Sequence, residues 1–128
     1  MDRFRIGEAA TMLGVSADTV RRWVDGGRLP AVRDEHGHRV VAGRDLAEFA
    51  RAASPPPHAL RGSSARNRFH GIVTAVTRDA VMAQVEIQAG PFRVVSLMSR
   101  EAVDELDLRV GAVASAVVKS TNVIVETP

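Results

Sequence analysis

The hydrophobic pattern of this chain changes its period once, on either side of a proline-rich segment, and that change limits the fold most strongly. In the first 53 residues, apolar positions recur every three or four residues, which is typical of amphipathic helices. After Arg68, apolar and polar residues alternate, which is typical of half-buried strands. Between them, Ser54-Pro55-Pro56-Pro57-His58 interrupts any helix and favours an extended spacer. The sequence therefore predicts an α+β chain of two small domains, with bounds 1–53, linker 54–62, and 63–128.

The first domain begins with two short helical patterns separated by a glycine turn. Residues 6–13 carry apolar side chains at i, i+3, i+4 and i+7, which defines one helical face. Gly14 can end this helix, because a residue without Cβ adopts positive φ without a clash. Ser16 is a favoured N-cap for a second helix at 17–25. Two short helices joined by a tight turn form a helix-turn-helix, although a helical hairpin that binds nothing shows the same pattern.

A hairpin and a third helix are predicted next. Residues 31–41 hold two short apolar stretches around the turn Asp34-Glu35-His36-Gly37, which is typical of a β-hairpin. Residues 44–50 return to helical spacing. His36 and His38 lie close in sequence, as in some metal sites, but no third ligand is near and the chain has no cysteine. We therefore expect a plain turn and no site for a metal cation.

Helix, turn, helix, hairpin and helix in this order resemble the winged helix-turn-helix domains of the MerR-like and excisionase-like families. The resemblance covers residues 3–52 and rests on Ile6-Gly7-Glu8-Ala9-Ala10, Val15-Ser16, Thr19-Val20-Arg21-Arg22-Trp23, Gly27-Arg28-Leu29-Pro30 and His38-Arg39. It implies that helix 17–25 enters the major groove of DNA and that the hairpin is a wing. Arginine suits either role, because it can bind guanine O6 and N7 or hold a phosphate. The expected contacts are Ser16, Thr19, Arg21 and Arg22 on the helix, and Arg33 and Arg39 in the wing, with Trp23 in the core.

The second domain has the pattern of a small β-barrel with one helix. Strands are predicted over 68–76, 81–88, 92–98, 113–119 and 122–126, with a Ser99-capped helix before the fourth. In the first strand, Ile72, Thr74 and Val76 should share one face. The helix should turn Ala102, Val103 and Leu106 inward. Five strands with this helix fit an OB-like barrel, and about sixty residues give a marginal core that oligomerisation would support.

Residues 63–126 resemble a single Mop/TOBE domain, a module that binds molybdate or tungstate. The resemblance rests on Ser64-Ala65-Arg66-Asn67, on the Ser99 helix leading to Leu106-Asp107-Leu108-Arg109-Val110-Gly111, and on Ala116-Val117-Val118-Lys119-Ser120-Thr121-Asn122-Val123. It implies that the oxyanion lies between subunits of a homo-oligomer, at least a dimer, with a hexamer as one allowed size. By position, the ligand contacts would be Ser64, Arg66, Ser96, Ser99 and Lys119.

The chemistry of these residues agrees with that assignment. A tetrahedral dianion needs hydroxyl and N–H donors, some positive charge and no acid nearby, and serines at a helix start meet part of this need. Each residue also has an ordinary interpretation: Ser99 as a plain N-cap, Lys119 as a solvated strand end, and Arg66 as part of a DNA-facing linker. Only one copy of the domain is present, whereas some molybdate regulators have two.

Charge and composition narrow the classes of function. The chain has a net charge of +2, but residues 54–70 carry three arginines and no acid, while 71–128 carry net −2. Positive charge is therefore concentrated in the N-terminal domain and the linker, as expected if DNA binds there. Lys119 is the single lysine among 17 basic residues. The sequence shows no cysteine, signal peptide or long apolar run, so we expect a cytoplasmic protein without a membrane partner. It shows no catalytic motif either, so we expect no enzyme.

Together the two resemblances predict a DNA-binding transcriptional regulator that responds to molybdate or tungstate. Two alternatives stay open. One is a molybdate or tungstate storage or buffering protein, which high-capacity anion binding without operator affinity would favour. The other is an excisionase-like architectural DNA-binding protein whose barrel only oligomerises, which the absence of any oxyanion effect on thermal stability would favour.

Overall fold

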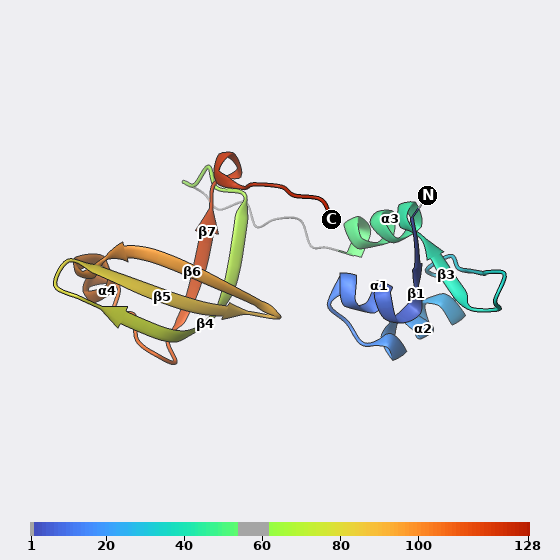
Figure 1. The fold of residues 1–128 in the computed structure, drawn as a ribbon, viewed down its shortest axis with the longest axis horizontal. Coiled ribbons are helices and arrows are strands. Elements are labelled where there is room, and N and C mark those ends of the chain that lie inside the picture. The colour runs from blue at the N-terminus through green and yellow to red at the C-terminus, as the bar shows by residue number, and fades with distance from the viewer. Residues whose placement is uncertain (1, 54–61) are drawn as a thin grey trace. The chain divides into compact units, whose positions relative to one another are not determined.

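The structure, a computed structural model, describes residues 2–53 and 62–128 (Figure 1). The chain divides into two compact units, 1–58 and 59–128. The proline-rich linker predicted at 54–62 lies, apart from Gly62, outside the described residues. None of the described helices combines the length and apolar character needed to cross a membrane.

Two helices lie close together in the N-terminal part of the first unit. They are α1 (Ile6–Leu13) and α2 (Ala17–Asp25). Gly14 ends α1 with φ 68°, and its N–H donates to carbonyls of the last turn. Ser16 begins α2, because its hydroxyl accepts the N–H of Thr19 at 3.2 Å. The predicted helix-turn-helix is confirmed, and its two turn signals act as expected.

A small sheet and a third helix complete the first unit. The elements are β1 (Arg3–Arg5), β2 (Val32–Arg33), β3 (Arg39–Ala42) and α3 (Gly43–Ala53). The central strand is β3, which pairs antiparallel with both β1 and β2. The predicted hairpin is therefore confirmed, whereas β1 was not predicted. Three residues are too few to show a period, and only Phe4 of β1 packs against the core.

One core holds the first unit together. Its buried side chains come from both helices, the loop after α2, β3 and α3: Ala9, Ala10, Val20, Leu29, Val41 and Leu46. Trp23 packs against this core, with its ring centroid 4.7 Å from that of Phe49, as expected. Because Val20 and Trp23 face inward, the side of α2 that carries Arg21 and Arg22 faces solvent.

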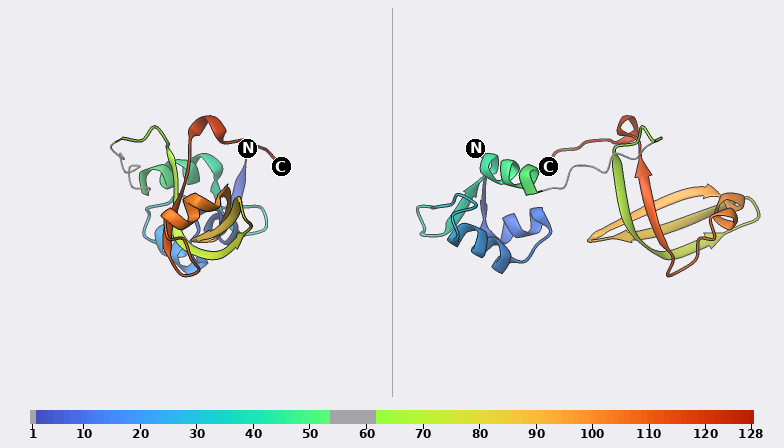
Figure 2. Two further views of the ribbon diagram at one scale, coloured as in Figure 1. Left: turned by 90° about the vertical axis from the view of Figure 1, so that its left-hand side faces the viewer. Right: turned by 180° about the vertical axis from the view of Figure 1, so that it is seen from behind.

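The second unit is a curled antiparallel sheet with one short helix. Its elements are β4 (Asn67–Arg78), β5 (Met82–Ala89), β6 (Phe92–Ser99), α4 (Arg100–Glu105), β7 (Val113–Val118) and the 3-10 turn η1 (Ser120–Asn122). The strand order is β6-β5-β4-β7. Figures 1 and 2 show β7 and the first part of β4 turning away from the direction of β5 and β6. This curl is OB-like, so the α+β class is confirmed.

The inner face of the curled sheet carries the core of the second unit. The buried residues are Val73, Ala83, Val85, Ile87 and, from α4, Val103. The register of β4 against β5 shifts between Val73 and Ala75, which is a β-bulge. Both Val73 and Val76 therefore reach the core, while Ile72 and Thr74 are exposed. The prediction that Ile72, Thr74 and Val76 share one face is wrong, because a bulge breaks the two-residue period.

The fifth predicted strand, at 122–126, does not form. After η1, residues 123–128 have no regular structure, and Ile124 is 86% exposed. The described sheet therefore has four strands. Leu106, which was expected to face inward from the helix, is 63% exposed, because α4 already ends at Glu105. An alternating apolar segment becomes a strand only beside a free strand edge, and this chain alone offers residues 123–125 no such pairing in the described part.

Candidate functional site

Three of the five residues expected to bind an oxyanion gather where β4 begins and β7 ends. Asn67 pairs with Val118 across these strands, and its side-chain amide donates to the Val118 carbonyl at 3.2 Å. Arg66 directly precedes Asn67, and Lys119 directly follows Val118. The two cationic residues are therefore neighbours across the ladder, with Ser64 two residues further along. We call Ser64, Arg66 and Lys119 the cationic end of the sheet.

The cationic end has no acid near it in sequence. No Asp or Glu occurs between residues 62 and 78 or between 108 and 125. Within the described residues, neither Arg66 nor Lys119 makes an ion pair; Nη1 of Arg66 instead lies 3.4 Å from the carbonyl oxygens of Ser63 and Ala65. Exposed positive charge without a carboxylate partner can form charge-assisted hydrogen bonds to an anion.

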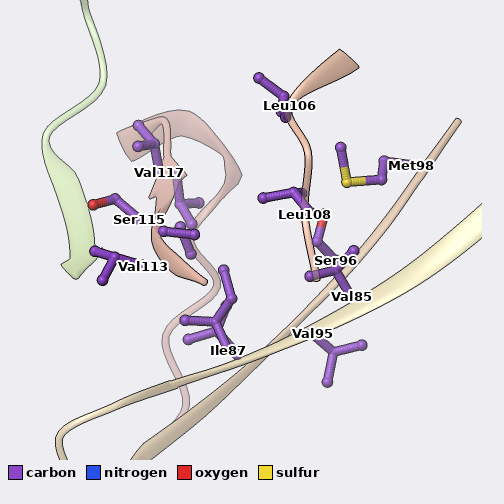
Figure 3. Close-up of a pocket in the computed structure, with 14 residues that line it drawn as sticks. Val85, Ile87, Val95, Ser96, Met98, Leu106, Leu108, Val113, Ser115 and Val117 are labelled. Atoms are coloured by element: carbon purple, nitrogen blue, oxygen red, sulfur yellow. The ribbon is translucent and has the colours of Figure 1, made fainter. Parts of the chain in front are cut away.

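The other two expected ligands lie on β6. Ser99 ends this strand and caps α4, because its hydroxyl accepts the N–H of Ala102 at 3.1 Å. The predicted N-cap is confirmed. Ser96 pairs with Val85 on the inner face of the sheet, and Figure 3 shows it among Val85, Leu108 and Met98.

The strand register separates Ser99 from the cationic end. Asn67 begins β4 at the cationic end, whereas Ser99 pairs with the start of β5, which lies beside the other end of β4 at Arg78. A straight strand that rises about 3.3 Å per residue would span on the order of 36 Å from Asn67 to Arg78. The curl of β4 shortens this distance. In one chain, Ser99 therefore lies beside the end of β4 that is remote from the cationic end.

An apolar hollow of about 510 Å³ opens on the inner face of the sheet (Figure 3). Valine, leucine, isoleucine, methionine and alanine side chains form most of its wall, and they come from β5, β6, β7 and the positions Leu106 and Leu108. Ser96 and Ser115 are its only polar lining residues, and none is charged. A dianion placed here would lack the charge and donors that replace water, so the hollow itself is a poor anion site. Its composition instead suits contact with other apolar side chains.

The first unit presents the predicted DNA contacts on α2. Arg21 and Arg22 are exposed. Nη1 of Arg21 lies 2.5 Å from a carboxylate oxygen of Asp18, and Nη2 of Arg22 donates to the Thr19 hydroxyl at 3.3 Å. The hydroxyls of Ser16 and Thr19 lie 2.8 Å apart. These two hydroxyls already serve the helix start, so the two arginines are the donors most available to DNA.

The wing holds its two arginines in fixed positions. Nη1 of Arg33 donates to the carbonyl of Gly37 at 2.6 Å, across the turn of the hairpin. Nη1 of Arg39 lies 2.6 Å from a carboxylate oxygen of Asp25, and this ion pair joins β3 to the end of α2. The wing and the helix that carries Arg21 and Arg22 are therefore linked, so they present their arginines as one surface.

The turn of the wing is organised by Asp34. Its carboxylate accepts the N–H groups of His36 and His38, each at 2.9 Å. Desolvation raises the pKa of Asp34, but these N–H groups outweigh it and hold the pKa below its ordinary value. The two histidines therefore lie in the turn of the hairpin that Asp34 organises. In the described residues, no three side chains of the metal-binding types come together.

Two residues near these arginines were missed by sequence reasoning. Arg5 and His38 line a second hollow together with Arg21, Arg33 and Arg39. Arg5 ends β1, which has no detectable period, so nothing placed it beside the wing. His38 was considered as a metal ligand and as part of the winged helix-turn-helix pattern, but not as a DNA contact. Basic charge near the chain start, at Arg3 and Arg5, was the one available signal.

Comparison with known families assigns each unit separately. Residues 4–54 match the helix-turn-helix domain family, and residues 63–125 match the TOBE domain family. Neither is a family of enzymes. The first match is to the helix-turn-helix domain in general and does not single out its MerR-like branch.

Relatives of known name resemble the second unit. Molybdenum-pterin-binding protein 2 of Clostridium pasteurianum is 40% identical over 63 residues, 48% of this chain and 93% of that protein. Molybdenum transport protein ModE of Herbaspirillum seropedicae is 38% identical over 66 residues, 51% of this chain but only 24% of ModE.

A solved structure resembles the second unit as well. It is the cytoplasmic molybdate-binding protein ModG with molybdate bound, which matches with a TM-score of 0.51 and 39% identity over 55% of this chain and 50% of the ModG chain. The curl of the sheet, the TOBE match and the 93% coverage of molybdenum-pterin-binding protein 2 all indicate the same family for the second unit. The chain belongs to the molybdenum-pterin-binding family, with a single TOBE domain as its second unit and a helix-turn-helix domain as its first.

Proposed function

We propose that this protein is a cytoplasmic, DNA-binding transcriptional regulator that responds to molybdate or tungstate. The observation that carries the proposal is the joining of a helix-turn-helix to a TOBE domain whose cationic end has no acid near it in sequence. The helix-turn-helix supplies an exposed pair of arginines beside a wing. The TOBE domain supplies Arg66 and Lys119 as neighbours across two strands.

The oxyanion is proposed to bind at the cationic end. Arg66 and Lys119 balance the charge of the dianion, and the hydroxyl of Ser64 donates to one of its oxygens. Ser96 and Ser99 are proposed to join from a second copy, since the register keeps Ser99 of the same chain away. Ser99 then offers the donors at the start of α4, which favour negative charge.

Assembly through the second unit is the next part of the proposal. The open hollow and the exposed segment at Val123, Ile124 and Val125 are both apolar, and each lacks a partner within the described chain. A second copy can cover both and bring the two groups of ligands together. The assembly is at least a dimer, and a hexamer is compatible with the same contacts.

The proposed mode of DNA binding follows from the symmetry of an assembly with two helix-turn-helix domains. Two helix-turn-helix domains that bind one duplex must match half-sites about 34 Å apart, one helical turn. An anion held between subunits stabilises one arrangement of the assembly, and through it one spacing of the heads. Anion binding and DNA affinity are therefore coupled, and each ligand changes the affinity for the other by the same factor.

Calorimetric titration of the full chain with molybdate, tungstate and sulfate tests anion binding. Molybdate and tungstate should bind far more tightly than sulfate, because the smaller anion cannot reach all donors at once. Lys119→Ala should weaken molybdate binding by about 1.5–3 kcal/mol, the loss of one charge-assisted hydrogen bond. Arg109→Ala is the matched control, since Arg109 is exposed and pairs with Asp107. Equal affinity for sulfate, or an unchanged dissociation constant in Lys119→Ala, contradicts the proposed site.

A storage or buffering protein is the second candidate. One observation favours it: molybdenum-pterin-binding protein 2, which this chain covers over 93% of its length, matches the TOBE domain alone. Binding of the full chain to genomic DNA fragments separates the two. Tight molybdate binding without preference for any fragment selects storage, whereas sequence preference without any effect of molybdate selects an architectural DNA-binding protein.

A further inference from the structure

The first unit has a hollow of about 300 Å³ where β1 ends, α1 begins, and both α2 and the wing approach. Four arginines and one histidine line it: Arg5, Arg21, Arg33, His38 and Arg39, with Ile6, Gly7 and Gly37 completing the wall. None of the lining residues is acidic. We call this the arginine hollow. Four guanidinium groups around one small space repel one another, so the arrangement favours an anion between them.

Three of these arginines make hydrogen bonds or ion pairs that hold their side chains in place. Arg33 is bound to the Gly37 carbonyl, while Arg21 and Arg39 are paired with Asp18 and Asp25 of α2. Both carboxylates lie outside the lining of the hollow. Within the described part of the chain, Arg5 and Arg33 make no ion pair. Arg21 and Arg39 are therefore balanced by carboxylates, and Asp34 lies 3.8 Å from His38 and also acts on Arg5, so Arg33, held by the Gly37 carbonyl, carries the least compensated charge of the hollow.

The backbone adds a donor of its own. Gly7 lies in the first turn of α1, where N–H groups have no partner within the helix. Gly7 also lines the hollow, and a Cβ there would meet nothing within 4 Å, so no neighbouring side chain fills the space beside its Cα. Guanidinium forks and a free N–H around one opening suit the several oxygens of a phosphate group.

We propose that the arginine hollow holds one backbone phosphate of bound DNA. The proposal rests on the DNA binding proposed above and adds Arg5 and His38 to the contact surface. It assigns Arg21 to phosphate, and it leaves Arg22, which does not line the hollow, as the candidate base contact on α2. A phosphate held at the joint between wing and helix fixes the position of α2 on the duplex but carries no sequence information.

The double variant Arg5→Ala/Arg33→Ala tests this in the full chain. Its affinity for a preferred genomic fragment and for random DNA should fall by the same factor, about tenfold or more at moderate salt. The slope of log K against log salt should decrease by about 0.9 for each head bound, one phosphate contact. Arg21→Ala should behave likewise, whereas Arg22→Ala should lower the preference between fragments. Arg44→Ala is the matched control, because Arg44 is an exposed arginine of α3 outside the hollow.

Further measurements distinguish a folding defect from a lost contact, and a DNA phosphate from a free phosphate-bearing ligand. Tryptophan fluorescence must show an unchanged unfolding midpoint in the double variant, and Arg5→Lys/Arg33→Lys should recover part of the affinity because it restores charge. Wild-type DNA binding with an unaffected double variant overturns the inference but leaves the proposed function intact. Wild-type protein that binds no DNA overturns both. Tight binding of inorganic phosphate that the double variant loses, with DNA binding unaffected, assigns the hollow to a free phosphate-bearing ligand and overturns the DNA assignment.

Discussion

The two units bury their apolar residues to very different extents. Of the exposed large apolar residues in the described chain, only Met12 and Val32 belong to the first unit. Thirteen belong to the second, among them Leu97, Leu106 and Ile124. The second unit also has an apolar hollow and an unpaired apolar segment, whereas the hollow of the first unit is lined by arginine.

The first unit buries nearly all of its large apolar residues within one chain, whereas the second leaves many of them exposed. The first unit closes its core with helices and a small sheet, and it presents charge outward. The second exposes contiguous apolar surface of the kind that marks an interface. We therefore propose oligomerisation and anion binding for the second unit, and DNA binding for the first. Because the single tryptophan, Trp23, lies in the first unit, its fluorescence reports on that unit alone.

The largest expected effect is on the core of the first unit. Leu29 is 1% exposed, so Leu29→Ala should destabilise this unit by about 2–5 kcal/mol, the usual loss on opening a core cavity. Urea unfolding followed by Trp23 fluorescence measures it. The association state in sedimentation should stay unchanged. Dissociation of the assembly by this substitution would show that the units depend on each other and would break the comparison.

The next effect concerns assembly through the second unit. In a single chain, Ile124 is exposed, and Ile124→Asp should cost nothing. If a second copy covers it, the substitution removes the burial of one isoleucine, about 1.5–3 kcal/mol for each copy. Sedimentation velocity should then show dissociation at low concentration. Met12→Asp, an exposed apolar residue of the first unit, is the matched control and should leave the assembly intact.

A pair of glycines should respond with opposite signs. A Cβ at Gly71 would collide with the Gln88 carbonyl at the end of the pairing between β4 and β5, so Gly71→Ala should destabilise the second unit by about 1–3 kcal/mol. Gly7 of α1 has open space around it, so Gly7→Ala should stabilise the first unit by about 0.5–1 kcal/mol. Far-ultraviolet circular dichroism and Trp23 fluorescence follow the two units. Equal responses at both positions would argue against the close approach of β4 and β5.

The smallest effects concern acid stability. Turn N–H groups hold the pKa of Asp34 in the wing and of Asp79 in the β4–β5 hairpin below the ordinary 3.8; for Asp79 the main donors are Met82 and Val81. A carboxyl with a lowered folded pKa contributes stability above its unfolded pKa, and loses it as pH falls through the folded value. Asp34→Asn should remove this dependence below pH 3.8 from the first unit, and Asp79→Asn from the second. An unchanged acid titration in both variants would contradict these roles.

Sequence patterns predicted those parts of the fold that depend on local signals. Gly14 and Ser16 define the helix-turn-helix, because cap chemistry acts within a few residues. Ser99 caps α4 for the same reason. The neighbouring positions of Arg66 and Lys119 required the pairing of β4 with β7, which no local pattern contains, so only the resemblance to the Mop/TOBE domain indicated that they act together.

Three of the failures involve partners distant in the chain. Three residues of β1 become a strand only because β3 lies beside them. The bulge at Val73 and Ala75 arises where the sheet curls, and alternation alone cannot reveal it. Residues 122–126 have a strand pattern without a strand edge to pair with. That mismatch is itself informative, because it identifies the segment for which we propose contact with another copy.

DNA binding in the presence and absence of molybdate tests the central claim most directly. Affinity of the full chain for fragments that include the DNA upstream of its own gene would be measured across a salt series, with molybdate and with sulfate. The account predicts a preferred fragment whose affinity changes with molybdate and not with sulfate, and loss of that change in Lys119→Ala. An affinity that molybdate leaves unchanged, in protein shown by calorimetry to bind it, would contradict coupling between the two units.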